Sequence, residues 1–210
     1  MILTYLGQET FKIQFGDLTI ALNPPSKDSS FKTGKFGADI VLQSISHEDM
    51  NGGKDYSYGE REPFVISGPG EYETKGIFIR GVAGESNYDD EKRINTIYSF
   101  TVDGISMLFL GAQSGPLPKD VSEIIDTVDL LFVPIGGKGV LDAKEAYKVA
   151  MNLDPKVIVP MHFKDVKDES LKSFLKEASA TSVAPVDKLT IKRKDVENKE
   201  GDVSILIPQA

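Results

Sequence analysis

The chain has 210 residues, no cysteine, two histidines and a formal charge of −8 at pH 7, with 40% hydrophobic and 27% charged residues. This composition is typical of a soluble globular protein, and we expect a single domain over residues 1–210. The negative charge disfavours nucleic acid and anionic membranes as partners. The lack of cysteine excludes disulfides, thiolate catalysis and zinc–cysteine sites.

No stretch is long and apolar enough to span a bilayer, and Met1–Gly7 carries no recognisable export signal. We therefore expect a cytoplasmic protein.

The first half of the chain predicts β-structure. Alternating residues on each side of Gly16-Asp17 predict a hairpin, and Asp103-Gly104 predicts a second one. The two hairpins resemble each other, which suggests two packed β-rich units. The strands expected in this half are 11–15, 18–22, 40–42, 64–66, 76–82, 97–102 and 105–110.

The second half alternates between predicted strands and helices. Asp142, followed by Glu145, predicts a helix start with a capping box, and its apolar face is Ala146, Val149, Ala150 and Leu153. Other expected helices are 119–127 and 169–179. Expected strands are 130–135 and 156–160, with 189–192 and 204–208 as a closing pair and a solvated charged turn at 194–202.

Polar or glycine-rich loops follow three of these strands, at 44–51, 111–115 and 161–163. Strand ends that converge on one edge are where α/β folds place their sites. Both histidines, His47 and His162, lie at such ends. Gly136 to Gly139 follows another strand and lacks the P-loop pattern, so we interpret it as a turn at the same edge, with Lys138 as a candidate anion contact.

Several segments are similar to landmarks of the metallo-β-lactamase-fold superfamily, and nearest to its compact bacterial Zn-dependent hydrolase-like proteins related to the ascorbate-6-phosphate lactonase group. They are Leu6-Gly7-Gln8-Glu9-Thr10-Phe11-Lys12-Ile13, Ala38 to Leu42, Phe64 to Glu73, Asn95 to Tyr98, Leu110-Gly111, Val133 to Gly137, Asp142 to Ala146 and Pro160-Met161-His162-Phe163. The resemblance implies an α/β (α+β) fold, a four-layer αββα sandwich, with two zinc ions around a bridging hydroxide at one edge.

The resemblance also implies where metal ligands would lie. The family's His-x-His-x-Asp-His motif falls on Ile45 to Met50, so His47 and Asp49 match ligands while Ile45 and Met50 replace histidines. The bridging aspartate falls on Ala112, and another histidine falls near Asn87, Tyr88 and Asp89. The last histidine matches His162, so three of seven ligand positions are retained.

Two functional interpretations follow from this ligand count. In the first, the two-metal site has degenerated, the protein has little or no hydrolase activity, needs no cofactor and binds a small molecule or a protein partner. In the alternative, His47, Asp49 and His162 hold a single Zn, Mn or Fe ion and the protein is a mononuclear hydrolase. A structural subunit of a homo-oligomer is the third reading. The serines near His47, which are Ser44, Ser46 and Ser114, show no nucleophile elbow or triad order.

Overall fold

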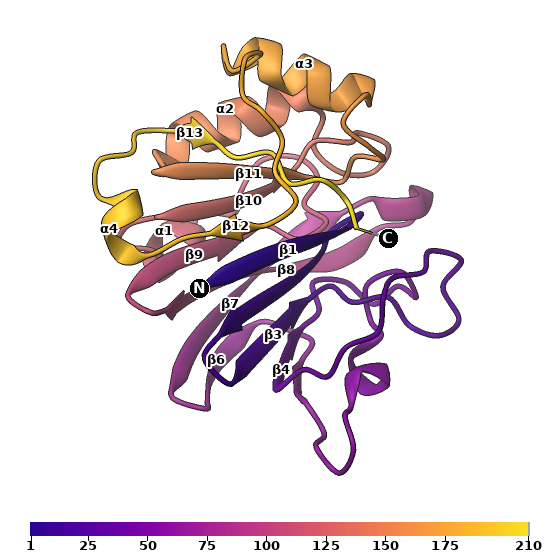
Figure 1. Ribbon diagram of the computed structural model, residues 1–210. Helices are drawn as coiled ribbons and strands as arrows, with labels where there is room; N and C mark the ends of the chain where they lie inside the picture. The colour runs from indigo at the N-terminus through magenta and orange to yellow at the C-terminus, as the bar shows by residue number, and fades with distance from the viewer. Residues whose placement is uncertain (210) are drawn as a thin grey trace.

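The computed structural model describes residues 1–209, which form two mixed β-sheets (Figure 1). The first sheet has the strand order β12-β1-β2-β3-β4-β5, and the second has the order β13-β11-β10-β9-β8-β7-β6. The first contains β1 (Ile2–Gly7), β2 (Thr10–Phe15), β3 (Leu18–Leu22), β4 (Ile40–Leu42), β5 (Phe64–Ile66) and β12 (Leu189–Thr190). The second contains β6 (Gly70–Thr74), β7 (Ile77–Ser86), β8 (Arg93–Val102), β9 (Ile105–Phe109), β10 (Leu130–Pro134), β11 (Val157–Met161) and β13 (Asp202–Val203).

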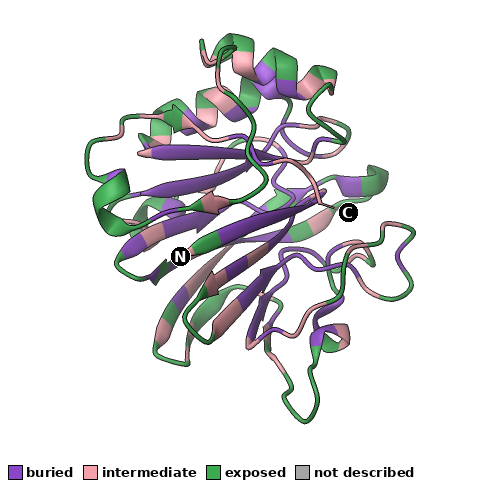
Figure 2. Ribbon diagram, viewed as in Figure 1, coloured by how far each residue is buried: buried purple, intermediate pink, exposed green. Residues whose placement is uncertain are grey.

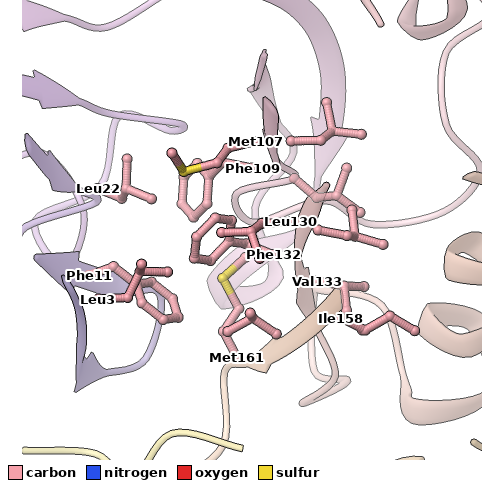
Figure 3. Close-up of a cluster of buried hydrophobic side chains, with 14 of the residues drawn as sticks. Leu3, Phe11, Leu22, Met107, Phe109, Leu130, Phe132, Val133, Ile158 and Met161 are labelled. Carbon is pink, nitrogen blue, oxygen red and sulfur yellow. The ribbon is translucent and has the colours of Figure 1, made fainter. Parts of the chain in front are cut away.

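The main hydrophobic core lies between the two sheets. Figure 3 shows Phe11 and Leu22 of the first sheet facing Phe109 and Phe132 of the second. The rings of Phe11 and Phe132 meet edge to face with centroids 4.9 Å apart, a favourable geometry for a buried aromatic pair. Burying aliphatic and aromatic side chains on both inner faces is the main force that holds the sheets together.

Two helices cover the outer face of the second sheet, α2 (Ala143–Leu153) and α3 (Glu169–Glu177) (Figure 1). The predicted capping box at the start of α2 is confirmed, because Asp142 accepts from the Glu145 amide (2.8 Å) and Glu145 accepts from the Asp142 amide (3.0 Å). Figure 2 shows the strands largely buried and the outer sides of both helices exposed. The predicted apolar face of α2 is also confirmed, with Ala146 and Ala150 fully buried.

A loop and a short 3₁₀ helix, η1 (Gly53–Tyr56), cover part of the outer face of the first sheet. Tyr56 packs there against Ala21 and Val41 in a small separate cluster, with Phe36 at its edge. The predicted four-layer α/β sandwich is confirmed in its two packed sheets, and its outer layer on the first sheet consists of this loop and η1. Across residues 1–209, the helices are all too short or too polar to pass through a lipid bilayer.

Both predicted hairpins are confirmed, and they lie in different sheets. Strands β2 and β3 pair in the first sheet, and β8 and β9 pair in the second. The predicted closing pair of strands, 189–192 and 204–208, is wrong. Strand β12 pairs with β1, and residues 204–208 contribute only an isolated bridge between Leu206 and Val186. Strand β13 precedes them and pairs with β11. The predicted helix at 119–127 shortens to α1 (Val121–Ile124), because Ile125 is already extended. The turn at 194–202 overlaps the end of a short helix, α4 (Arg193–Val196), whose Val196 is fully buried.

The topology brings several strand ends to one edge of the sandwich. Strand β10 runs parallel to β9 and β11, and β4 runs parallel to β3. The loops after β4, β9, β10 and β11 therefore meet, together with the turn between β1 and β2. At this edge Ala112 donates its amide hydrogen to Ser44 Oγ (3.3 Å), which joins the loop after β9 to the loop after β4.

Candidate functional site

The loop after β4 positions His47 and Asp49. A turn closes between them, with the Met50 amide donating to the His47 carbonyl (2.9 Å). The Asp49 amide donates to His47 Nδ1 (3.2 Å), so Nδ1 is an acceptor and the imidazole proton lies on Nε2. That Nε2 lies 3.7 Å from Asp89 Oδ2, and His47 Nδ1 lies 3.7 Å from Asp49 Oδ2.

Tyr88 contacts both histidines and the aspartate. It begins η2 (Tyr88–Asp90), the 3₁₀ turn after β7. Its hydroxyl donates to Asp49 Oδ2 (2.8 Å), and its ring stands edge-on to His47 at 4.9 Å and to His162 at 5.7 Å, measured between centroids. Burial, followed by the hydrogen bond to the Asp49 carboxylate, raises the pKa of the Tyr88 hydroxyl far above its usual range. Tyr88 therefore remains protonated and donates to Asp49.

A close approach of two loops holds Tyr88 in place. The Asn87 amide donates to the Gly139 carbonyl (3.1 Å). Gly139 has φ +94°, and a Cβ at this position would lie 2.4 Å from the Asn87 carbonyl oxygen. Only glycine fits both this conformation and this contact. The loop after β10 is thus a backbone support for the turn that carries Tyr88.

His162 lies at the end of β11 and is paired with a buried carboxylate. His162 Nδ1 lies 3.0 Å from Glu9 Oε1, and Glu9 is completely buried in the turn between β1 and β2. Asn23 donates to the other carboxylate oxygen, Oε2, at 2.9 Å. A carboxylate oxygen accepts this hydrogen bond, so Nδ1 carries a proton, and in the neutral imidazole Nε2 then carries the lone pair. The backbone of His162 has φ +65°, and its amide donates to the Gln8 carbonyl (2.5 Å) and to Tyr5 Oη (3.0 Å), which ties the end of β11 to the β1–β2 turn.

Apolar side chains occupy the positions where the family resemblance implied further metal ligands. Ile45, Met50 and Ala112 are buried and form one cluster with Tyr88 and Val140. Met50 Sδ accepts a hydrogen bond from Asn23 at 3.4 Å, so the cluster touches the polar network around Glu9. The centre of the site is therefore a packed core capped by polar side chains.

The structure brings the predicted ligands to one edge, where Tyr88 contacts all three of them. Across residues 1–209, no group of three or more His, Cys, Asp and Glu side chains is arranged to hold a metal ion. The assignment of His47, Asp49 and His162 as ligands of one ion stays a prediction. Among the serines, Ser44 contacts Asn23 (2.8 Å) and Ser114 contacts the Glu85 carbonyl (3.4 Å).

Sequence reasoning missed Glu9 as a functional side chain. A signal was present, because Gln8-Glu9 stands where the family has His-Ala, and this places a carboxylate in a buried turn. Its partner His162 is 153 residues away, so only the fold reveals the pair. Tyr88 lies in the segment, with Asn87 and Asp89, where the resemblance implied a missing histidine, but its contacts with Asp49 and both imidazoles could not be predicted.

A cavity of about 590 Å³ opens beside His162. Its walls come from the β1–β2 turn, the loops after β10 and β11, and the start of α3. Two lysines, Lys138 and Lys164, line it together with Phe31 and Phe163. The volume lies in the range of small-molecule sites.

Comparison with known proteins places the chain in a family. The model of the Beta-lactamase superfamily domain matches residues 2–162, more than half of the chain. A UPF0173 metal-dependent hydrolase of Pyrococcus abyssi is 33% identical over 98 residues, covering 45% of this chain and 44% of that protein. The chain thus aligns with under half the length of this relative. One from Lysinibacillus sphaericus is 25% identical, covering 78% of this chain and 85% of the relative.

Solved structures show the same fold. A crystal structure from Thermotoga maritima, assigned to the Zn-dependent hydrolases of the metallo-β-lactamase superfamily, superposes with a TM-score of 0.74. It is 29% identical, with 98% of this chain and 97% of that chain covered. A metallo hydrolase of the archaeon Ignicoccus hospitalis superposes with a TM-score of 0.61 at 19% identity, covering 100% of this chain and 96% of that one. The chain is thus a member of the metallo-β-lactamase superfamily, with the fold of its metal-dependent hydrolases.

Proposed function

We propose that this protein is a ligand-binding member of the metallo-β-lactamase superfamily, in which a Tyr88-centred cluster has replaced the metal site. The observation that carries the proposal is the position of Tyr88. Its hydroxyl binds Asp49, and its ring contacts both His47 and His162. Hydrolysis by the family's two-metal mechanism requires this space for the ions and their bridging hydroxide.

The donor atoms of the site do not fit a metal in this arrangement. A histidine binds a metal through a ring nitrogen lone pair, and the His47 Nδ1 lone pair accepts the Asp49 amide instead. Asp49 accepts from Tyr88 Oη on one oxygen and from Ser29 Oγ on the other. His162 offers Nε2 alone. Each Asp49 oxygen retains a lone pair, because a carboxylate oxygen accepts two hydrogen bonds. His162 Nε2 and the Asp49 carboxylate thus leave two protein ligands, fewer than the about three that a catalytic zinc ion requires.

The apolar cluster supports the same proposal. Ile45, Met50 and Ala112 would have to move apart to admit an ion, and they are packed together with Val140 beneath Tyr88. Desolvating a divalent ion next to these side chains is unfavourable because they offer no oxygen or nitrogen ligands. The degenerate site is therefore stabilised by packing.

The proposal is tested by titrating the chelator-treated protein with Zn²⁺, Mn²⁺ and, under nitrogen, Fe²⁺ in a calorimeter. We expect no site with a dissociation constant below the micromolar range, and no hydrolysis of phosphodiester, lactone or β-lactam substrates. His162→Ala and Lys176→Ala serve as a matched pair, since Lys176 is exposed on α3, away from the site. Submicromolar binding that His162→Ala removes and Lys176→Ala retains would refute the proposal.

The alternative is a mononuclear metal-dependent hydrolase that uses His47, Asp49 and His162. Two relatives are described as metal-dependent hydrolases, which favours this alternative. The 3.7 Å distance between His47 Nδ1 and Asp49 Oδ2 also favours it. It requires Tyr88 to leave Asp49 and His47 to give up its bond with the Asp49 amide. In this case one equivalent of metal binds, and both His47→Ala and His162→Ala abolish hydrolysis.

A further inference from the structure

We propose that the cavity beside His162 binds a small organic anion, with its acidic group between Lys138 and Lys164 and its apolar body against Phe31 and Phe163. This inference rests on the proposed function, because it requires His162 Nε2 to be free of metal. The four side chains line one cavity of about 590 Å³, and no family comparison assigns a ligand to it.

The charges of the cavity favour an anion. Lys138 and Lys164 are its two cationic side chains, and within residues 1–209 neither forms an ion pair. The acidic side chain in the lining, Asp168, is already satisfied. It accepts from the Lys164 amide (2.8 Å), the Ser170 amide (2.9 Å) and Ser170 Oγ (2.8 Å). The cavity is thus a cationic site on a protein whose formal charge is −8.

The turn that carries Lys138 has left-handed backbone over three consecutive residues. Gly137, Lys138 and Gly139 have consecutive φ values of +62°, +51° and +94°. This left-handed run turns the chain sharply after β10, and the Gly137 amide closes it by donating to the Leu141 carbonyl (3.0 Å). Left-handed backbone is unfavourable for lysine, so the loop holds a strained residue at the cavity wall.

His162 lines the same cavity and provides a hydrogen-bond acceptor there. Its Nδ1 is bound to the buried Glu9, which leaves the Nε2 lone pair for a ligand hydroxyl or amine. The His162 side chain is 15% exposed and belongs to the cavity lining. Phe163, which contributes to the apolar lining of the cavity, is buried, and its ring packs on Tyr5 with centroids 5.2 Å apart.

The test uses phenyl phosphate as the probe and benzyl alcohol as its uncharged counterpart. The ¹⁵N-labelled full-length chain is dialysed against chelator, and amide shifts are followed during titration. We expect saturable shifts at Gly136, Gly137 and Ser170 with phenyl phosphate and none with benzyl alcohol. Lys138→Gln and Lys164→Gln should each weaken binding roughly five- to tenfold, as expected for loss of one charge-assisted contact. Lys176→Gln, the same charge change outside the cavity, should leave binding unchanged.

The outcomes separate this inference from the proposed function. The anion site is refuted if the metal-free protein shows no saturable shift, if benzyl alcohol shifts the same amides equally, or if Lys138→Gln and Lys164→Gln bind as the wild type does. In each of these cases the proposal that the site holds no metal ion is unaffected. The proposed function itself fails if phenyl phosphate binds only after zinc is added and chelator reverses the binding.

Discussion

Removing the Tyr88 hydroxyl by Tyr88→Phe deletes its 2.8 Å hydrogen bond to Asp49 Oδ2 and leaves the ring in place. Hydrogen bonds to charged groups contribute about 1.5–3 kcal/mol. Asp49 keeps the bond from Ser29, and its side chain is 13% exposed to water. We therefore expect the free energy of unfolding to fall by about 1–2 kcal/mol at pH 7.

Tyr88→Ala removes the ring as well and is expected to cost about 3–5 kcal/mol, the range for truncating a buried aromatic side chain. Urea unfolding followed by circular dichroism measures both variants. Burial, together with Asp49, raises the pKa of Tyr88 in the fold, so the hydroxyl ionises first in the unfolded chain as the pH passes about 10. The difference between wild type and Tyr88→Phe should therefore shrink above that pH. A Tyr88→Phe protein within about 0.5 kcal/mol of wild type at pH 7 would refute the role given to the hydroxyl.

Three further predictions concern Glu9 and Gly139, which belong to the site, and Asp129, which lies away from it. Glu9→Gln supplies an acceptor to only one of its two donors, so we expect the free energy of unfolding to fall by about 1.5–3 kcal/mol and the His162 imidazole proton to lose its single tautomer in ¹⁵N spectra. Gly139→Ala places a Cβ 2.4 Å from a backbone carbonyl, whereas Gly115, at φ +70°, has open space; in thermal unfolding Gly139→Ala should lower Tm clearly more than Gly115→Ala, and equal effects would contradict the close approach. Burial raises the pKa of Asp129, but hydrogen bonds from a lysine and a backbone amide outweigh burial and lower it. Asp129→Asn should therefore destabilise the protein near neutral pH, and the difference should vanish as the pH falls below about 4 through the lowered pKa; a difference independent of pH between 7 and 2 would contradict this.

Local patterns predicted much of the fold because their structural causes are local. The Asp103-Gly104 turn and the capping box at Asp142 involve residues close in sequence, and both are present. The sheet partners of β12 and of β13 were not predictable in this way. Two-residue strands carry almost no pattern, and their partners, β1 and β11, are selected by the packing of the whole sandwich. Strand β6 was missed because the turn-forming Gly68-Pro69-Gly70 precedes it and its side chains are mostly exposed.

The site was predictable in its position but not in its contacts. Strand ends placed His47 and His162 at one edge, and the family resemblance marked Ile45, Met50 and Ala112 as apolar residues at ligand positions. The side chains that fill that space are distant in sequence: Tyr88 is 39 residues from Asp49, and Glu9 is 153 residues from His162. A single sequence does not reveal such pairs, because no local periodicity links them.

The metal content of the protein purified without chelator tests the central claim most directly. Inductively coupled plasma mass spectrometry of the wild-type chain should find zinc, manganese and iron each well below one equivalent per chain. The reason is that Tyr88 contacts both imidazoles and donates to Asp49. Lys176→Gln, exposed on α3, serves as the matched control and should give the same result. One or two equivalents of a bound transition metal in the wild-type protein, lost in His162→Ala but retained in Lys176→Gln, would contradict the account.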